Sequence, residues 1–379
     1  SFSTQQLLPP WHSEGAETWM YLISVKEELM QGYLDRHFNE GGPDQSPYHY
    51  EPWTNPCFGF LQVVDHPKFS SEHVRPDLDS AATTHTTPDG DPECEHWDTV
   101  RHTEVFFSFP AARYKRTPDN LIIEKKLVWI QPYYFDDNSY VMFSSREIWG
   151  SEKEMAKIQI NRGKEINQLH IDVAAQGFKV FNPNSKSHSI GVMHLRMDSD
   201  AKQTTLADVR KNDKELTSML GSLQGHLPKE WTDPAPAKTL TLPDFEINTL
   251  KQYRDVFDMH DAVYRAIIAS RASHSNITEM SVFRGEHVNV DFMWSDSMKE
   301  QFVELFGLQP PDENSPWGHR GTGLHNDEGD TDWNMQSVPV DVKLAVFFRS
   351  DALFEVLGTL HTYGGGAQYL PPDGDSPEV

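Results

Sequence analysis

Cysteine is scarce in this sequence, long apolar runs are missing, and basic residues are outnumbered by acidic ones. The two cysteines, Cys57 and Cys94, are too few for a disulfide framework, and a reducing compartment is the default for such a chain. No stretch approaches the roughly 20 apolar residues of a membrane-spanning helix. The first residues show no basic segment followed by an apolar core. We therefore expect a cytoplasmic protein without a membrane partner.

The charge is strongly negative. The 379 residues include 33 Lys and Arg against 57 Asp and Glu, which gives a formal net charge of -24. A phosphate backbone would be repelled by this field, so we expect no nucleic-acid partner. An anionic substrate would also be repelled at long range, and its site would need positive charge supplied locally.

Several common site signatures are missing. There is no Gly-x-Ser-x-Gly elbow, and Gly364–Gly366 lacks the helix and the Lys-Ser/Thr pair of a phosphate loop. One polar stretch concentrates possible zinc ligands, namely His66, His73, His85, Cys94, His96 and His102. Their spacing matches no closed zinc site, so we interpret them as loop histidines and predict neither a metal nor another cofactor.

Aromatic residues make up 11% of the chain, and together with Val and Ile they gather in alternating runs typical of strands. The strands predicted in this way are 58–64, 103–109, 121–130, 140–144, 169–181, 189–197, 277–283, 287–294, 340–348 and 354–363. Three helices are predicted: 24–38 with a Ser24/Glu27 capping box, 205–222 with Thr205 as its N-cap, and 297–306 with a Ser297/Glu300 capping box and Gly307 as its end. Turn-forming residues predict long loops at 66–100 and 308–337 and a Pro-rich connector at 225–243. Because strands outnumber helices and do not alternate with them, we predict a mainly β (α+β) fold with an antiparallel barrel or sandwich and peripheral helices.

The segment from Tyr133 to Lys153 resembles the central motif of acetoacetate decarboxylases. It contains an Asp137-Asn138 turn and an Arg146-Glu147 pair, and Lys153 falls at the family's catalytic lysine without a gap. Upstream, Thr103-Glu104 and the later Pro110 resemble the segment with the family's active-site glutamate. Further scattered blocks, 250–255 and 294–308, also match. The resemblance implies an acetoacetate decarboxylase-like domain at 1–308 and a C-terminal extension at 309–379, which packs on the same domain and ends in a disordered tail.

What the resemblance implies is a cone-shaped antiparallel β fold and a cofactor-free lyase that acts on a small keto substrate. Lys153 would form a Schiff base with a β-keto acid, and Glu104 would position the substrate or move a proton. Arg146 is the candidate for holding a substrate carboxylate, and a structural pair of Arg146 with Glu147 that supports the strand is the preferred alternative. Trp149, Tyr140 and Phe143 would surround the amine. The family also implies a homo-oligomer.

The chemistry requires an unprotonated amine, and a free lysine has a pKa of about 10.4. Burial in an apolar site lowers that pKa because it disfavours the charged form. Acetoacetate decarboxylase is itself a known example of a lysine activated by desolvation or a nearby cation. This sequence has Glu152 and Glu154 beside Lys153, where the family has Pro and a second lysine, and Ala16 near the family's N-terminal arginine.

These departures leave two alternatives open. The first is a Schiff-base aldolase, dehydratase or cyclase that acts on a ketone without a carboxylate. The second is a non-catalytic protein that binds a small ligand on the same fold. Judged by its neighbours alone, Lys153 lies in a charged surface turn, and an exposed, ordinary Lys153 far from Glu104 would favour the second alternative.

Overall fold

The computed structural model describes residues 9–40, 44–71, 99–223, 244–254, 262–309, 331–333 and 335–363. Its thirteen strands are connected in one sheet. They are β1 (Trp11–Ser24), β2 (Tyr48–Pro52), β3 (Phe58–Ser71), β4 (Thr99–Arg116), β5 (Ile122–Asp136), β6 (Lys153–Arg162), β7 (Leu169–Gly177), β8 (His188–Met197), β9 (Phe245–Arg254), β10 (Ala262–Arg284), β11 (Val288–Met293), β12 (Ser337–Val340) and β13 (Val342–Thr362).

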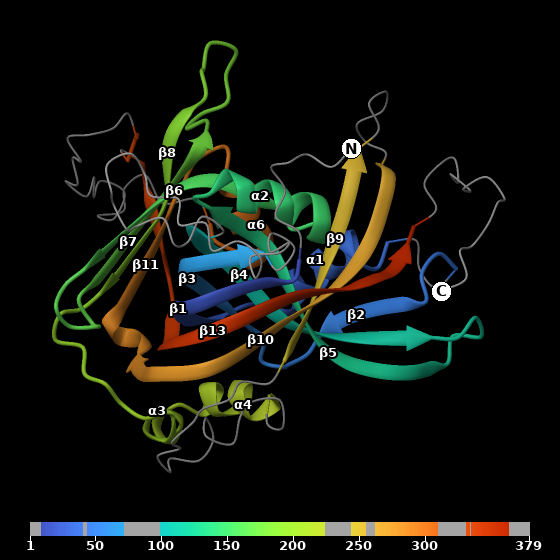
Figure 1. Cartoon of the computed structure of the whole chain (residues 1–379), viewed down its shortest axis with the longest axis horizontal. Coiled ribbons are helices and arrows are strands. Elements are labelled where there is room, and N and C mark those ends of the chain that lie inside the picture. Colours follow the sequence, from blue (N-terminus) through green and yellow to red (C-terminus); the bar gives the residue numbers. More distant parts are fainter. Residues whose placement is uncertain are drawn as a thin grey trace, which may run out of the picture.

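Helices are shorter and lie outside the sheet. They are α1 (Glu27–His37), α2 (Ser139–Ser144), α3 (Leu206–Asn212), α4 (Lys214–Ser222) and α6 (Lys299–Phe306), with a π-helical turn η3 (Ser145–Trp149) and a short 3-10 turn η4 (Gly285–His287). Figure 1 shows α3 and α4 below the long strands and α2 and α6 above them. The prediction of a mainly β fold with peripheral helices is confirmed.

Seven strands follow one another in the order β5-β9-β10-β13-β1-β3-β4, and β4 pairs with β5 again, so the hydrogen-bonded path returns on itself. The ring is uneven, because β5 and β9 pair through only two residues. Six strands lie outside the ring. The strand β2 pairs with β4, and the other five leave the ring at β5 as a wing in the order β6-β7-β8-β11-β12. Neighbouring strands are antiparallel apart from the β5–β6 and β5–β9 pairs.

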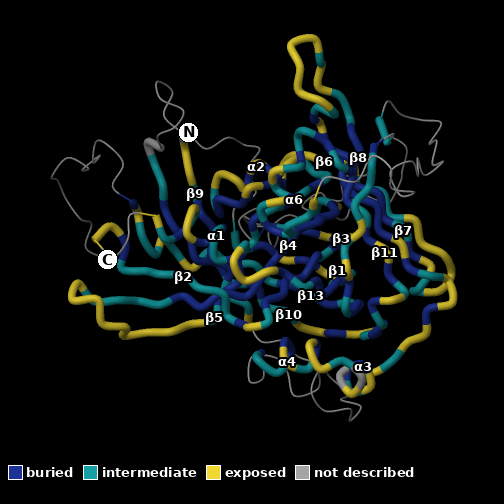
Figure 2. Tube along the Cα trace, turned by 180° about the vertical axis from the view of Figure 1, so that it is seen from behind, coloured by how far each residue is buried: buried dark blue, intermediate teal, exposed yellow. Residues whose placement is uncertain are grey.

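Alternation along the ring strands decides which side chains face the interior. On β1, Trp19 and Tyr21 pack into the core between ring and wing, whereas Thr18 and Met20 line an internal cavity. Successive strand residues point to opposite faces, so the same alternation separates Val105 from Glu104 and Phe106 on β4. Figure 2 shows the strands of the ring and the wing largely buried, with exposed residues in connecting turns and in the first part of β5.

The central motif folds differently from the prediction. Residues 140–144 were predicted as a strand, but they form α2 and continue into the π-helical turn η3. The Asn138 side chain accepts hydrogen bonds from the backbone N–H groups of Tyr140 and Val141, and it thereby caps the helix. A β-rich composition did not reveal this local cap, which turns the chain out of the sheet between β5 and β6.

Two predicted capping boxes are wrong. Ser24 is the last residue of β1, and α1 begins at Glu27 without a side-chain cap. Ser297 bonds the backbone of Phe178 instead of starting α6, although Gly307 ends that helix with a positive φ of 61° as predicted. The predicted helix at 205–222 begins after Thr205 as expected, but Asp213 divides it into α3 and α4 and caps the second.

The last strand in sequence, β13, lies in the middle of the sheet. Residues 340–348 and 354–363 were predicted as two strands, yet β13 is one strand that lies between β10 and β1. Its Ala345 and Phe347 belong to the same core as the wing. The connector predicted at 225–243, most of the loops at 66–100 and 308–337, and the tail after residue 363 lie outside the described residues.

Among the described residues, no helix has the length and apolar character needed to cross a membrane.

Candidate active site

Lys153 is the first residue of β6, and its side chain points into the ring. The strand begins beside Tyr134 of β5, with which Lys153 is paired in parallel register. Lys153 is 3% exposed, whereas its neighbours Glu152 and Glu154 are exposed. Strand alternation therefore directs the two sequence-adjacent carboxylates away from the amine. The interpretation of this stretch as a surface turn is wrong for Lys153 itself.

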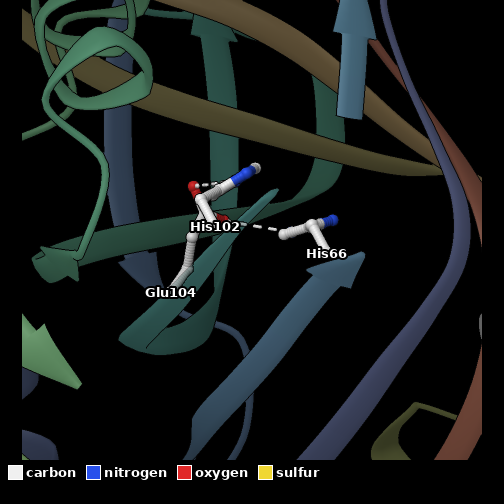
Figure 3. Close-up of side chains that lie close together, drawn as sticks. All are labelled: His66, His102 and Glu104. Carbon is white, nitrogen blue, oxygen red and sulfur yellow. Dashed lines mark ion pairs between the residues drawn. The ribbon is translucent and has the colours of Figure 1, made fainter. Parts of the chain in front are cut away.

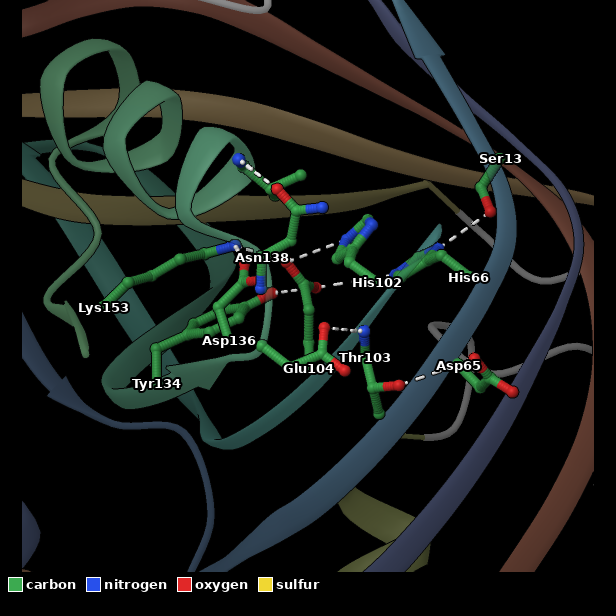
Figure 4. A network of polar contacts seen from close by, with 12 residues as sticks. Ser13, Asp65, His66, His102, Thr103, Glu104, Tyr134, Asp136, Asn138 and Lys153 are labelled. Carbon is green, nitrogen blue, oxygen red and sulfur yellow. Dashed lines mark hydrogen bonds and ion pairs between the residues drawn. The ribbon is translucent and has the colours of Figure 1, made fainter. Parts of the chain in front are cut away.

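Two carboxylates from neighbouring strands hold the amine. The Nζ atom of Lys153 donates to Oε1 of Glu104 on β4 and, at 3.0 Å, to Oδ2 of Asp136 at the end of β5. Glu104 and Asp136 are paired across β4 and β5, which brings their side chains together. The other oxygen of Asp136 accepts from the backbone N–H of Asn138 at 2.8 Å, so the turn after β5 fixes this carboxylate. Figure 4 shows the resulting network.

Glu104 is the centre of the cluster. Its Oε2 atom accepts a 2.5 Å hydrogen bond from the hydroxyl of Tyr134. The Nε2 atoms of His66 and His102 lie 3.5 Å and 3.4 Å from its two oxygens, and the two imidazole rings stack with centroids 4.4 Å apart (Figure 3). A hydrogen bond of 2.8 Å joins Nδ1 of His66 to Oγ of Ser13 on β1. Four strands of the ring thus position groups around one carboxylate.

The electrostatics of the three ionisable groups depend on each other. Burial disfavours the charged form of Lys153, but the carboxylates of Glu104 and Asp136 outweigh it and raise the amine's pKa above its usual value. Burial likewise disfavours the charged form of Glu104, yet the Lys153 ammonium and the nearby imidazoles hold its pKa well below the usual range. Burial, with a contribution from Glu104, raises the pKa of Asp136 to about 7 against the opposing effect of Lys153.

The neighbouring His102 and Tyr134 remain neutral. Burial is the main cause that lowers the pKa of His102 to about 4, with a further contribution from His66. Burial, followed by Glu104, raises the pKa of Tyr134 well above its usual value, so this hydroxyl keeps its proton and donates it. The resting cluster accordingly holds an ammonium, an ionised Glu104 and an Asp136 that exchanges a proton near neutral pH.

Four residues of the cluster, His66, Glu104, Tyr134 and Lys153, line a cavity of about 100 Å³ inside the ring. A single water molecule needs about 10–15 Å³ in this measure, so the cavity accommodates an organic molecule. Most of its lining is apolar, and aromatic side chains are prominent, among them Trp11, Phe60, Phe106, Trp129, Phe245 and Phe348. A buried amine on the wall of an apolar cavity is a typical setting for nucleophilic lysines.

The predicted substrate-binding residues are only partly brought together. Trp149 lies on the cavity wall and stacks on Trp11 with ring centroids 4.9 Å apart. Tyr140 and Phe143 are 48% and 56% exposed and do not line this cavity, because the α2 helix turns them outward. Neither of these two side chains therefore surrounds the amine. Arg146 is exposed as well, and its guanidinium donates to the backbone carbonyl of Lys153 at 3.3 Å.

Sequence reasoning missed Asp136, Tyr134, His66 and His102. The first two belong to the segment with the recognised motif, and the sequence-adjacent Asp137-Asn138 turn was the signal that β5 ends there. His66 and His102 were interpreted as loop histidines, which is wrong, because β3 and β4 pair them directly opposite each other. His102 lies two residues before Glu104 on β4, so the period of a strand could have placed both side chains on one face. No sequence signal placed His66 near them, since its position depends on the register of β3 and β4.

Three groups among the described residues bring His and acidic atoms close enough to share a cation. In the group of His66, His102 and Glu104, the Lys153 ammonium already pairs with the carboxylate and opposes a second positive charge. The group on the wing comprises His170, Asp172 and His194, and the Oδ1 atom of Asp172 lies 2.9 Å and 2.5 Å from the two imidazoles. The third group, Asp198, Asp200 and His287, lies at the surface.

Comparison with known proteins gives structural matches alone. No family model and no curated protein matches the chain. It is similar to acetoacetate decarboxylase from Legionella pneumophila, at 11% identity and a TM-score of 0.45, over 95% of this chain and 92% of the other. A second similar structure is the enduracididine biosynthesis enzyme MppR complexed with the condensation product of pyruvate and imidazole 4-carboxaldehyde, at 12% identity and a TM-score of 0.46 over 94% and 92% of the two chains.

An acetoacetate decarboxylase-like enzyme from Sphingomonas wittichii is similar at 9% identity and a TM-score of 0.41, over 93% of this chain and 96% of the other. Acetoacetate decarboxylases are the family that the segment from Tyr133 to Lys153 resembles. At such identities and TM-scores the likeness concerns the course of the chain and not the chemistry of the site.

Proposed function

We propose that this protein is a Schiff-base enzyme, in which the amine of Lys153 condenses with the carbonyl of a small-molecule substrate. The resulting iminium then promotes the cleavage or formation of a carbon–carbon bond next to that carbonyl. One observation carries the proposal. Lys153 is buried between two carboxylates at the wall of an apolar cavity, where a lysine without a chemical role would be costly to keep.

The condensation conserves protons within the site. The ammonium of Lys153 first gives one proton to a carboxylate, for which Asp136 is suited because its pKa is about 7. The free amine attacks the carbonyl carbon, and the N–C bond forms as the C–O π pair moves to oxygen. A second proton from nitrogen and the proton held by the carboxylate leave with that oxygen as water. The products are a protonated iminium and water, and both carboxylates return to their starting state.

Glu104 and Tyr134 would assist at the same carbon. Tyr134 donates to Glu104 in the resting state, and Glu104 remains ionised beside the new positive charge on nitrogen. Once Lys153 has lost its proton and attacks as a neutral amine, positive charge develops again on nitrogen, and an ionised carboxylate beside it stabilises that charge and lowers the barrier.

The iminium is an electron sink for the second half of the reaction. In decarboxylation of a β-keto acid, the bond to the carboxylate breaks, its electron pair forms an enamine, and CO2 leaves. In an aldol-type cleavage, a base removes a β-hydroxyl proton and an aldehyde leaves with the same electron movement. In both cases the enamine is protonated on carbon and hydrolysed, which restores Lys153. These reactions share the Lys153 chemistry and differ in the leaving fragment.

Reductive trapping tests the proposal. Sodium cyanoborohydride is added to the protein with acetone, acetoacetate or 2-nonanone, followed by intact-mass and peptide analysis. The expected result is a single adduct on Lys153 that is absent in Lys153→Ala. Lys157→Ala is the matched control, because Lys157 lies exposed on the same strand, and it should trap like the unaltered protein. A folded protein that binds ketones in the cavity without any Lys153 adduct would contradict the enzyme proposal and favour a ligand-binding protein.

A further inference from the structure

The cavity is poor in positive charge. Among its lining residues in the described part of the chain, Lys153 is the only lysine or arginine. This single cation is already balanced by Glu104, and Asp136 lies on its other side. Arg146, the candidate for holding a substrate carboxylate, is exposed, and its guanidinium donates a hydrogen bond to the backbone carbonyl of Lys153.

Charge balance through the reaction favours an uncharged substrate. Before condensation the site contains an ammonium and an ionised Glu104, and after it an iminium and the same carboxylate. A neutral carbonyl compound preserves that balance at each stage. A β-keto acid would add a further buried negative charge next to two carboxyl groups with no additional cation, and an unpaired buried charge is strongly unfavourable.

The shape and polarity of the remaining wall agree with this reading. Along β5 the lining extends from Tyr134 to Trp129, a separation of five residues that spans about 16 Å at the rise of a strand. Three buried polar atoms on the wall have no hydrogen-bond partner among the described residues, and all are uncharged, namely Oγ1 of Thr18, Oγ of Ser145 and Nε1 of Trp149. Buried polar groups are nearly always paired, so oxygen atoms of a bound molecule would complete them.

We propose that the substrate is an uncharged ketone or aldehyde with an elongated apolar body, and that the reaction is of the aldol type (cleavage, condensation or dehydration) and not the decarboxylation of a free β-keto acid. This inference rests on the proposed function, because it concerns the molecule that condenses with Lys153. The carboxylates of Glu104 and Asp136 disfavour an acidic substrate, and they also provide a base that can remove the proton of a β-hydroxyl group in aldol-type cleavage.

A matched pair of probes tests the charge preference. The ketone 2-nonanone and the β-keto acid 3-oxodecanoate differ only by the carboxylate that decarboxylation would remove. Trapping at Lys153 is measured over a range of concentrations of each, with acetone as the short reference, and enzyme-dependent CO2 release from 3-oxodecanoate is measured against Lys153→Ala. The same three compounds are titrated calorimetrically without reductant.

The expected result is half-maximal trapping by 2-nonanone at a concentration at least tenfold lower than by 3-oxodecanoate and by acetone, with CO2 release no faster than in Lys153→Ala. Equal or better trapping of 3-oxodecanoate, or enzyme-dependent CO2 release, would overturn the inference while leaving Lys153 as the nucleophile. Equal trapping of acetone and 2-nonanone would overturn the inference that the substrate has an elongated apolar body. If no compound labels Lys153, the proposed function fails, and the calorimetric preference between 2-nonanone and 3-oxodecanoate still decides whether the cavity selects uncharged ligands.

Discussion

The Oδ2 atom of Asp136 lies 3.0 Å from the Nζ atom of Lys153, and the two side chains are 0% and 3% exposed. Asp136 comes from the last position of β5 and Lys153 from the first position of β6, and the α2 and η3 turns connect them. The 16 residues between them therefore leave the sheet after β5 and return beside the end of that strand. The proton state of the amine consequently depends on Asp136 as well as on Glu104.

The first prediction concerns pH. Asp136, with a pKa of about 7, is protonated below that pH and ionised above it, and only the ionised form accepts the amine proton. The initial rate of acetone trapping should rise between pH 6 and 8 with a midpoint near 7. Because the groups interact, this midpoint belongs to the cluster. This rise with pH should disappear in Asp136→Asn. It should persist in the control variant Glu154→Gln, whose side chain is exposed. A step that persists in Asp136→Asn would assign the titration to another group.

The second prediction compares two adjacent tyrosines. Tyr134 donates to Glu104 at 2.5 Å inside the cavity, whereas Tyr133 donates to Glu304 at 2.9 Å on the other side of β5. A hydrogen bond to a charged group contributes about 1.5–3 kcal/mol, so Tyr134→Phe should slow trapping about tenfold or more. Tyr133→Phe loses an equivalent bond and should destabilise the fold by about as much in denaturant unfolding, but its trapping rate should not change. Equal rates in both variants would remove Tyr134 from the chemistry.

The third prediction separates two roles of Arg146. Since its guanidinium donates to the backbone carbonyl of Lys153 at 3.3 Å, we expect Arg146 to be a positioning residue. Arg146→Gln should lower the trapping rate about two- to tenfold, in line with the loss of one hydrogen bond of about 0.5–1.5 kcal/mol. The loss should be the same for acetone and acetoacetate, and Arg146→Lys should restore part of it. A selective loss for acetoacetate would show instead that Arg146 binds a substrate carboxylate.

The fourth prediction concerns the stability of the wing. Burial opposes ionisation of Asp172, but its bonds to His170 and His194 outweigh this and lower its pKa to about 2. A group whose pKa is depressed on folding stabilises the protein above its unfolded pKa, and this contribution is lost as the pH falls through the folded pKa.

Asp172→Asn should therefore lower the free energy of unfolding by about 2–3 kcal/mol at pH 5–7, since the pKa of Asp172 lies almost two units below the usual 3.8 and one pKa unit corresponds to about 1.4 kcal/mol. The difference from the unaltered protein should shrink towards zero as the pH falls from about 4 to 2. Urea unfolding at each pH measures it. Asp332→Asn, whose carboxylate pairs with exposed partners, is the control and should change stability by less than about 0.5 kcal/mol. A constant difference at all pH values would contradict the electrostatic explanation.

Most strands could be predicted from composition and alternation, and the errors in the predicted elements share a physical cause. The strand β1 escaped prediction because its polar positions, such as Ser13 and Thr18, face the interior and mask the alternation. Residues 140–144 have the composition of a strand, but the Asn138 cap and the end of β5 made them helical. In each case tertiary pairing or a single capping side chain outweighed local propensity.

The β-rich class, the excess of negative charge and two residues of the candidate site, Lys153 and Glu104, could be predicted from the sequence, because a local motif and its upstream match point to them. That Asp136, Tyr134 and His66 lie beside them, and that Tyr140, Phe143 and Arg146 do not line the cavity, depends on the tertiary structure. The physical reason is register. A side chain enters the cavity according to the strand alternation and the cross-strand partner of its residue, and a shift of one residue in either would place it on the opposite face.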